Sequence, residues 1–361
     1  MSLPTLAPHE RALRSCVYCP KLCRASCPVA LAEPRETLTP WGKMSLVHFA
    51  AHGDVPLDGD HTEPAWACAA CYACKERCDH EVEVAAVLTD ARAAFFARGC
   101  VPQAVRGLVD GWPARSEELA RLVCAIDPAP GAAAPKAVLV GCSYVRGSPA
   151  AARAVLALAG SFGAAGPTRA LRRCCGLPLL YAGDAHGFAR AARELAAEAS
   201  GAGRLVVADP GCAWTLRSAY PKLGVRLPPV QLLVDLLAAA LDRLPAGGLG
   251  PLALRYHDPC QLGRGLGRYA EPRAVLARLT GRPAASFPRS REQGECCGGG
   301  GLLPLARPRA SQEIAAQRIA EHRQAGGGRL VTACGGCLRR YRACGEDAVD
   351  LYELAAQVLG Q

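Results

Sequence analysis

Five cysteines near the carboxyl end of the chain have the spacing of metal ligands. They are Cys260, the adjacent pair Cys296 and Cys297, and the two cysteines of a Cys-Gly-Gly-Cys step, Cys334 and Cys337. The apolar runs 252–256 and 329–333, which we expect to be short buried strands, lead towards Cys260 and Cys334. Ligands of parallel α/β sheets bind beyond the carboxyl ends of the strands, so two strands would deliver thiolates to one rim. The pattern predicts a metal-cluster site.

A run of glycines, Gly298 to Gly301, follows the cysteine pair. Residues without Cβ let the backbone approach an inorganic core closely, and backbone N–H groups can donate to cluster sulfurs. We therefore expect Gly298 and Gly299 to contact a cofactor. His257 precedes Cys260 and is the histidine best placed for proton transfer beside that cofactor, with a structural hydrogen bond as its alternative role.

Two alternatives to an iron–sulfur cluster are a set of buried core cysteines and a zinc site. Free cysteines are often buried, but core packing gives no reason for the order C…CCGGGG…CxxC. Zinc sites close with four ligands rather than five, and they are usually built from paired CxxC steps. The pattern favours a cluster over both alternatives.

The segments around these cysteines resemble the CCG (cysteine-rich) domain of heterodisulfide reductases. The matching segments are His257-Asp258-Pro259-Cys260, Cys296-Cys297-Gly298-Gly299-Gly300 and Thr332-Ala333-Cys334-Gly335-Gly336-Cys337. Related domains occur in the iron–sulfur subunits of glycolate oxidase, anaerobic glycerol-3-phosphate dehydrogenase and lactate-utilisation systems. In the heterodisulfide reductase branch such five-cysteine sets hold a non-cubane [4Fe-4S] cluster, and the resemblance implies the same here.

Two runs of four cysteines nearer the amino end are typical of a two-cluster ferredoxin. They are Cys16, Cys19, Cys23 and Cys27, then Cys68, Cys71, Cys74 and Cys78. In such ferredoxins the first three cysteines of a run bind one [4Fe-4S] cluster and the fourth crosses to the other. Carried onto this chain, the rule assigns Cys16, Cys19, Cys23 and Cys78 to one cluster, and Cys68, Cys71, Cys74 and Cys27 to the other. The first run has one extra residue after Cys19, and the chain must bulge there; zinc is the less favoured alternative.

The segment between the runs resembles the one that joins the two motifs in the same iron–sulfur subunits. Thr39 as a cap and Pro40 in the first turn predict a helix that continues to Ala51. After the second run, the alanine-rich segment 81–98 is also expected to be helical.

From Lys136 onward the sequence repeats itself. Cys142 follows an apolar run as Cys260 does, Cys174 and Cys175 match Cys296 and Cys297, and Cys212 follows the run 205–208 as Cys334 follows its own run. At the offset shared by the last two matches, Thr215 stands where the second copy has Cys337. A hydroxyl is a poor iron–sulfur ligand, so the sequence leaves open whether the first copy binds a cubane, a smaller cluster or none.

These motifs predict an α/β protein: an N-terminal α-helical two-cluster ferredoxin domain followed by two repeated Rossmann-like cysteine-rich lobes. We place the ferredoxin domain at 1–100, a linker at 101–135, lobe one with its incomplete motif at 136–248, and lobe two with its complete motif at 249–361.

Composition limits the location and the partners. The chain has 20 cysteines and no apolar leader, which favours thiolate ligation in the cytoplasm. The apolar run 230–244 is broken by Asp235 and Asp242 and is too short to span a bilayer, so we expect a core helix, with binding to the inner face of the membrane as a minor alternative. The net charge of +10 comes without an aromatic-interleaved basic stripe, which argues against nucleic-acid binding.

Architecture and resemblance together indicate an electron-transfer subunit. It would take electrons from a flavoprotein dehydrogenase and deliver them to a quinone, a membrane subunit or a thiol/disulfide carrier. The alternative is a heterodisulfide or disulfide reductase whose active site is the lobe-two cluster; a zinc-stabilised scaffold is a third. The sequence leaves open whether the chain alone is an enzyme. Gly263-x-Gly265-x-Gly267 is a weak dinucleotide motif, because its third glycine comes one residue early.

Overall fold

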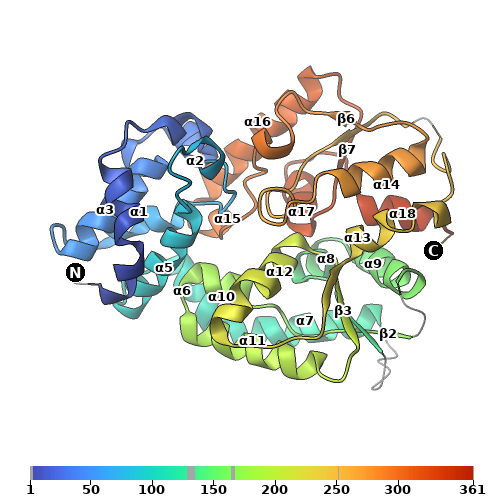
Figure 1. Cartoon of the computed structure of the whole chain (residues 1–361), viewed down its shortest axis with the longest axis horizontal. Helices are drawn as coiled ribbons and strands as arrows, with labels where there is room; N and C mark the ends of the chain where they lie inside the picture. Colours follow the sequence, from blue (N-terminus) through green and yellow to red (C-terminus); the bar gives the residue numbers. More distant parts are fainter. Residues whose placement is uncertain (1–2, 128–134, 164–166, 251, 361) are drawn as a thin grey trace. The chain divides into compact units, whose positions relative to one another are not determined.

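The computed structural model describes residues 3–127, 135–163, 167–250 and 252–360 (Figure 1). These residues divide into two compact units. The first unit comprises 1–112, 178–188 and 292–318, so it combines the ferredoxin region with one segment from each repeat. The second comprises 113–177, 189–291 and 319–361.

The first unit is helical. Its helices in the ferredoxin region are α1 (Glu10–Val17), α2 (Pro28–Ala32), α3 (Pro40–His52), α4 (Gly59–Thr62), α5 (Val84–Ala97) and α6 (Gln103–Asp110). The segments contributed by the two repeats carry α10 (Leu177–Ala182), α15 (Leu303–Ala306) and the start of α16 (Pro308–Gln324). Their common core includes Leu13, Met44, Trp66, Phe95 and Ala182. Burial of these apolar side chains stabilises a domain that has no described strands.

The helix predicted between the cysteine runs is confirmed. Thr39 caps α3, and its Oγ1 accepts the N–H of Gly42 at 2.9 Å. The helix predicted over 81–98 begins three residues later, at Val84, because Glu81 has the left-handed φ of 51° that no helix interior accepts.

The second unit contains two parallel sheets with the same topology. Their orders are β2-β1-β3-β4 and β6-β5-β7-β8, each a 4-stranded sheet. The strands of the first are β1 (Lys136–Leu139), β2 (Thr168–Ala170), β3 (Arg204–Val207) and β4 (Val230–Leu232). Those of the second are β5 (Leu254–Tyr256), β6 (Ala285–Ser286), β7 (Arg329–Thr332) and β8 (Ala348–Asp350). The expected internal repeat and parallel α/β lobes are therefore confirmed.

Helices join and cover these strands. They are α7 (Trp112–Ile126), α8 (Cys142–Gly147), α9 (Pro149–Ser161), α11 (Ala185–Ala199), α12 (Pro210–Trp214), α13 (Leu233–Ala238), α14 (Ala270–Thr280), α17 (Gly335–Ala343) and α18 (Leu351–Val358). Within the unit α18 packs against α9 and α17 against α8, so the last helices of lobe two lie on the first helices of lobe one.

Two segments differ from expectation or extend it. The run 230–244 is not one helix, because Val230 pairs with Leu205 as the start of edge strand β4 and only Leu233–Ala238 is α-helical. The region assigned as a linker contains α6 and α7, while its residues 128–134 lie outside the described residues. Every helix in the described ranges is too short or too polar to cross a membrane.

A buried carboxyl group connects the two lobes of the second unit. Asp350 is 0% exposed; it caps α18 by accepting the N–H of Tyr352 at 2.8 Å and accepts the hydroxyl of Tyr144 at 2.8 Å. Burial raises its pKa from 3.8 to about 8. The protonated form is thus favoured by folding, so its contribution to stability is complete below about pH 4 and is lost as the pH rises through about 8.

Replacing Asp350 should remove this pH dependence. We expect Asp350→Asn to flatten the decline in the free energy of unfolding between roughly pH 5 and pH 8, because an amide has no proton to lose. Anaerobic urea denaturation across that range measures the slope. Asp347→Asn, whose side chain is 80% exposed, is the matched control; equal slopes in all three proteins would contradict the assignment.

Candidate iron–sulfur sites

Two pockets in the first unit are lined by the cysteines of the two runs. The inner pocket is lined by Cys27, Cys68, Cys71 and Cys74, with Lys43 and apolar residues such as Val84 and Leu88 completing its wall. The outer pocket is lined by Cys16, Cys19, Cys23, Cys74 and Cys78, together with Lys21, Trp41 and His80. The fourth cysteine of each run thus lies in the pocket of the other run, and Cys74 is the cysteine that borders both.

The backbone of the second run is shaped around the inner pocket. Ala70 and Tyr72, on either side of Cys71, have left-handed φ values of 50° and 61°. That conformation costs a residue with Cβ about 1–2 kcal/mol, so it persists only where the surroundings impose it. The turn brings the N–H of Ala70 within 3.4 Å of Cys68 Sγ, and Val82 N–H lies 3.5 Å from Cys78 Sγ. Such donors suit thiolates that bind a cluster.

The extra residue of the first run is absorbed at Lys21. Its φ of 70° places it in the left-handed region, directly before the 3-10 helix Leu22–Ser26 that carries Cys23. The turn therefore returns Cys23 to the outer pocket despite the longer spacing. The expected bulge is present, one residue after Pro20.

The chemistry of these thiols fits a metal cluster. Burial raises the pKa of Cys16 to about 12, and the neighbouring thiols Cys23, Cys78 and Cys19 raise it further. Burial likewise raises the pKa of Cys23 to about 11 and that of Cys74 well above its ordinary value. Gathered thiols of this kind cannot all ionise without a compensating positive charge. Iron would supply that charge, since ligation requires thiolates and releases their protons.

The glycine-rich loop of lobe two lies against the inner pocket within the first unit. Cys296 and Cys297 are 2% and 3% exposed, and their Sγ atoms accept the N–H groups of Gly298 at 3.3 Å and Gly299 at 3.4 Å. A Cβ on Gly301 would lie 2.1 Å from the carbonyl oxygen of Cys68. The sequence indicated that glycines were needed for a close approach; it did not indicate that the ferredoxin backbone is what they approach.

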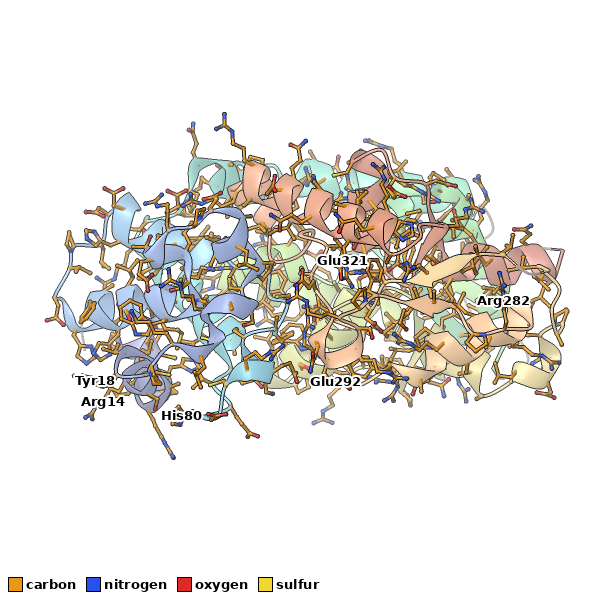
Figure 2. The ribbon with its side chains drawn as sticks, turned by 90° about the horizontal axis from the view of Figure 1, so that it is seen from above. Arg14, Tyr18, His80, Arg282, Glu292 and Glu321 are labelled. Carbon is orange, nitrogen blue, oxygen red and sulfur yellow. The ribbon has the colours of Figure 1, made fainter. Side chains whose placement is uncertain are left out.

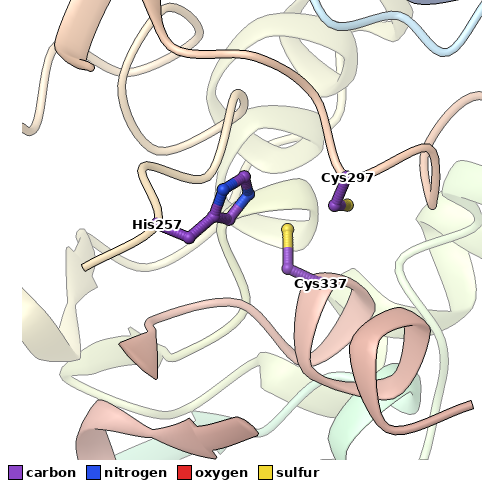
Figure 3. Close-up of side chains that lie close together, drawn as sticks. All are labelled: His257, Cys297 and Cys337. Carbon is purple, nitrogen blue, oxygen red and sulfur yellow. The ribbon is translucent and has the colours of Figure 1, made fainter. Parts of the chain in front are cut away.

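Three further predicted ligands belong to the second unit. Cys260 lies in the turn after β5, Cys334 is the N-cap of α17, and Cys337 lies in the first turn of that helix. The side chains of His257 and Cys337 point toward one another (Figure 3), with a ring nitrogen within 4.8 Å of the sulfur. The hydroxyl of Tyr341 lies 3.1 Å from His257 Nδ1, so the histidine has both a structural partner and a thiol neighbour.

An ion pair positions the loop that carries His257 and Cys260. Arg273 donates to both carboxylate oxygens of Asp258, at 2.6 and 2.8 Å, and the N–H of Arg291 donates to the same group. Burial alone would raise the pKa of Asp258, but these donors hold it below its ordinary value. The carboxylate therefore stays ionised and fixes the loop.

The thiols of lobe one form two close pairs. Cys142 and Cys174 have their Sγ atoms 3.9 Å apart, and Cys175 and Cys212 have theirs 3.4 Å apart. Thr215 is fully buried and donates its hydroxyl to Gly211 O at 2.7 Å, within its own helical segment. Lobe one thus gathers four thiols without a fifth.

Two exposed apolar side chains are next in sequence to cysteines of the outer pocket. Tyr18 is 81% exposed and Leu22 is 62% exposed, although each lies next to a cysteine of the first run. Figure 2 shows Tyr18 with Arg14 and His80 at the edge of the first unit. An exposed aromatic ring beside a redox site is suited to a partner surface. Both residues directly precede a cysteine of the first run, and this position in the sequence is the signal that could have predicted the surface.

Two family models match the chain. The cysteine-rich domain matches residues 137–217 and 254–340, and the 4Fe-4S dicluster domain matches residues 12–82. The match includes both lobes, although only lobe two has all five cysteines.

Curated relatives include components of redox complexes. One of them, a component of the fumarate reductase (CoM/CoB) of Methanothermobacter marburgensis, is 25% identical over 90% of this chain and 66% of its own length. Another, from the dihydromethanophenazine:CoB–CoM heterodisulfide reductase of Methanosarcina barkeri, is 32% identical over 52% of this chain and 49% of its own. EtfAB:quinone oxidoreductase of Syntrophomonas wolfei is 33% identical over 28% of this chain and 14% of its own length. The chain spans less than two thirds of the length of these proteins, from 14% to 66%.

The domain matches and the relatives agree with the two cysteine-lined pockets and the two parallel lobes. Thiolate sets of this number and spacing serve one-electron transfer through [4Fe-4S] clusters, two of which belong to the dicluster domain. The chain belongs to the family of iron–sulfur oxidoreductases that join a 4Fe-4S dicluster domain to cysteine-rich CCG domains.

Proposed function

We propose that this protein is the electron-relay subunit of a larger complex. It accepts electrons from a flavoprotein, passes them through the clusters of the outer and inner pockets, and delivers them to a cluster bound by lobe two. The observation that carries the proposal is the contact of Gly301 with Cys68, which places the loop bearing Cys296 and Cys297 directly on the backbone of an inner-pocket ligand.

The two pockets support one assignment of the cluster ligands. Cys16, Cys19, Cys23 and Cys78 hold the outer [4Fe-4S] cluster, and Cys27, Cys68, Cys71 and Cys74 hold the inner one. The pocket linings support this assignment, because the fourth cysteine of each run lines the pocket of the other run. Each set provides the four thiolates that a cubane needs.

The terminal cluster belongs to lobe two. Its ligands are Cys260, Cys296, Cys297, Cys334 and Cys337, and the fifth thiolate favours a non-cubane [4Fe-4S] cluster over a cubane. The N–H groups of Gly298 and Gly299 donate to the ligand sulfurs, which stabilises negative charge there. Lobe one lacks the fifth thiol at Thr215 and serves mainly as a scaffold.

The electron donor docks at the outer pocket. Tyr18 and Leu22 give this face two exposed apolar anchors within one residue of the ligands Cys19 and Cys23. A flavoprotein fits the position, because organic hydride acceptors can pass electrons singly to clusters. The chain's net charge of +10 favours a donor with an acidic surface. The acceptor is a quinone, a membrane subunit or a thiol/disulfide carrier.

Disulfide reduction at the lobe-two cluster is the second candidate function. The nearness of His257 to Cys337 favours it, since cleaving a disulfide into two thiols consumes two electrons and two protons, and the imidazole could deliver protons at that site. Viologen-driven disulfide reduction by the chain alone distinguishes this function from a relay.

The terminal cluster should be lost selectively. We expect Cys297→Ser to remove one EPR species and leave the ferredoxin-type signals intact. The reason is that the lobe-two cluster and the two ferredoxin clusters have separate cysteine ligands. Iron, sulfide and zinc analysis of the same anaerobic samples provides the count, which should match about three clusters in the unaltered protein. Cys344→Ser is the control. Stoichiometric zinc without iron would end the iron–sulfur assignment.

The relay should depend on the inner cluster. With the co-purifying flavoprotein and its substrate present, Cys71→Ser should abolish reduction of the lobe-two cluster. Dye reduction by the flavoprotein should be unaffected, because the substrate is oxidised at the flavoprotein before electrons reach the inner cluster. Stopped-flow absorbance and freeze-quench EPR measure the two events. Cys124→Ser should behave as the unaltered protein. Lobe-two reduction at an unchanged rate in Cys71→Ser would contradict the route.

The docking face should control the rate of electron entry. We expect Tyr18→Ser with Leu22→Ser to slow second-order reduction by the co-purifying flavoprotein about tenfold, since a few residues carry most of an interface's binding energy and tyrosine is enriched among them. Leu223→Ser, at a residue 38% exposed in the second unit, should have no effect. An unchanged rate in the double variant would place the donor elsewhere.

A further inference from the structure

One buried cation lines the inner pocket, and a second contacts the backbone of one of the pocket's cysteines. Lys43 and Arg92 are each 1% exposed, although lysine and arginine are rarely buried without an acidic partner. Lys43 lines the pocket, and its Nζ donates to Cys27 Sγ at 3.6 Å. Arg92 donates to the carbonyl oxygen of the ligand residue Cys68 at 3.0 Å. Each cation therefore contacts one of the residues assigned to the inner cluster.

Neither cation is neutralised by a carboxylate among the residues that the structure describes. The remaining partners of Arg92 are the carbonyl oxygens of Ala65 at 2.9 Å, and of Tyr181 and Gly301 at 3.2 Å each. Carbonyl dipoles satisfy the N–H groups but leave the net charge in place. A buried charge without a counter-ion is costly, so a negatively charged group is expected beside these cations.

The outer pocket differs in its electrostatics. Its lysine, Lys21, is half-exposed, forms an ion pair with Glu36 at 3.2 Å and lies 3.8 Å from the centre of the Trp41 ring. Solvent and the carboxylate both reduce the field of this charge at the outer thiols. Of the two pockets, the inner one has the stronger uncompensated positive field.

We propose that Lys43 and Arg92 make the inner cluster the electron-collecting site of the relay by raising its reduction potential above that of the outer cluster. A reduced cluster has one more negative charge than an oxidised one, and the two buried cations stabilise that charge more than solvent would. Electrons that enter at the outer pocket then accumulate at the inner one. This inference rests on the relay proposed above.

Arg92 also has a positioning role. One of its nitrogens, Nη1, donates to Tyr181 from the segment of lobe one and to Gly301 from the segment of lobe two. The same guanidinium donates to Ala65 and Cys68 from the ferredoxin region. It therefore fixes the loop that carries Cys296 and Cys297 at the electron-collecting site. A lysine could keep the charge but could not make this planar set of contacts.

Potentiometric titration with EPR detection tests the proposal without any partner protein. The inner signal is identified as the one lost in Cys71→Ser. At the potential where the inner cluster of the unaltered protein is half reduced, Lys43→Met should lower its reduced-to-oxidised ratio about tenfold, a shift of ~59 mV for one electron. The outer signal should not move. Lys75→Met removes an exposed charge next to Cys74 that is paired with Glu83, and it should leave both signals in place.

Arg92 variants separate charge from position. Arg92→Gln should lower the inner potential as Lys43→Met does, whereas Arg92→Lys should keep the potential and slow electron transfer from the inner to the lobe-two cluster. An unchanged inner potential in Lys43→Met overturns the proposal, as does an equal shift of both clusters. If the inner cluster does not assemble in Lys43→Met, the test passes to Arg92→Gln, and an unchanged inner potential in that variant overturns the proposal. If the potentials shift as expected but no electrons reach the lobe-two cluster, the relay function is refuted while the effect of the two cations on the inner cluster stands.

Discussion

The guanidinium of Arg92 is the contact on which the first unit depends. It draws together carbonyl oxygens from Ala65, Cys68, Tyr181 and Gly301, which are far apart in the sequence. Because a buried donor that loses its acceptor costs about 1–3 kcal/mol, each of these segments is held to the others by the need to satisfy one cation. Glycines complete the contact: a Cβ on Gly183 would lie 2.4 Å from the carbonyl oxygen of Arg92, and one on Gly301 would lie 2.1 Å from that of Cys68. The ligand loops and the repeat segments are thus assembled together.

The cysteine-rich pockets are unfavourable structures until their thiols bind metal. Left-handed backbone at Ala70, Tyr72 and Lys21 raises the energy of the folded chain, and buried thiols such as Cys74 resist ionisation. Buried Lys43 adds a further cost of desolvation. A cluster offsets these terms through its metal–thiolate bonds, and folding and loading are therefore coupled. The same cations that destabilise an empty pocket stabilise an electron on a loaded one.

The two lobes have one topology and differ in their chemistry. Both sheets have the same strand order, and both lobes have a cysteine pair within or just before the segment that they contribute to the first unit. The fold tolerates Thr215 in lobe one because its hydroxyl bonds to Gly211 within the helix and leaves no buried donor unpaired. The hydrogen bond from the Tyr144 hydroxyl of lobe one to the buried carboxyl group of Asp350 in lobe two joins the two copies within the second unit.

The sequence by itself determined the iron–sulfur chemistry and the internal repeat. The number and spacing of the cysteines can be read from short stretches of the chain, and the apolar runs that precede them recur in both copies. The sequence predicted the family, the parallel lobes and the cap at Thr39. The crossed ligand sets stay a prediction, with the fourth cysteine of each run lining the pocket of the other run. The sequence did not determine where α5 begins or that 230–232 forms an edge strand, since a left-handed residue and a strand partner decide those points. Nor could it identify Lys43 and Arg92 as buried cations. Whether a lysine or an arginine lacks a counter-ion depends on which carbonyls and carboxylates distant segments bring to it, and only the tertiary structure decides that.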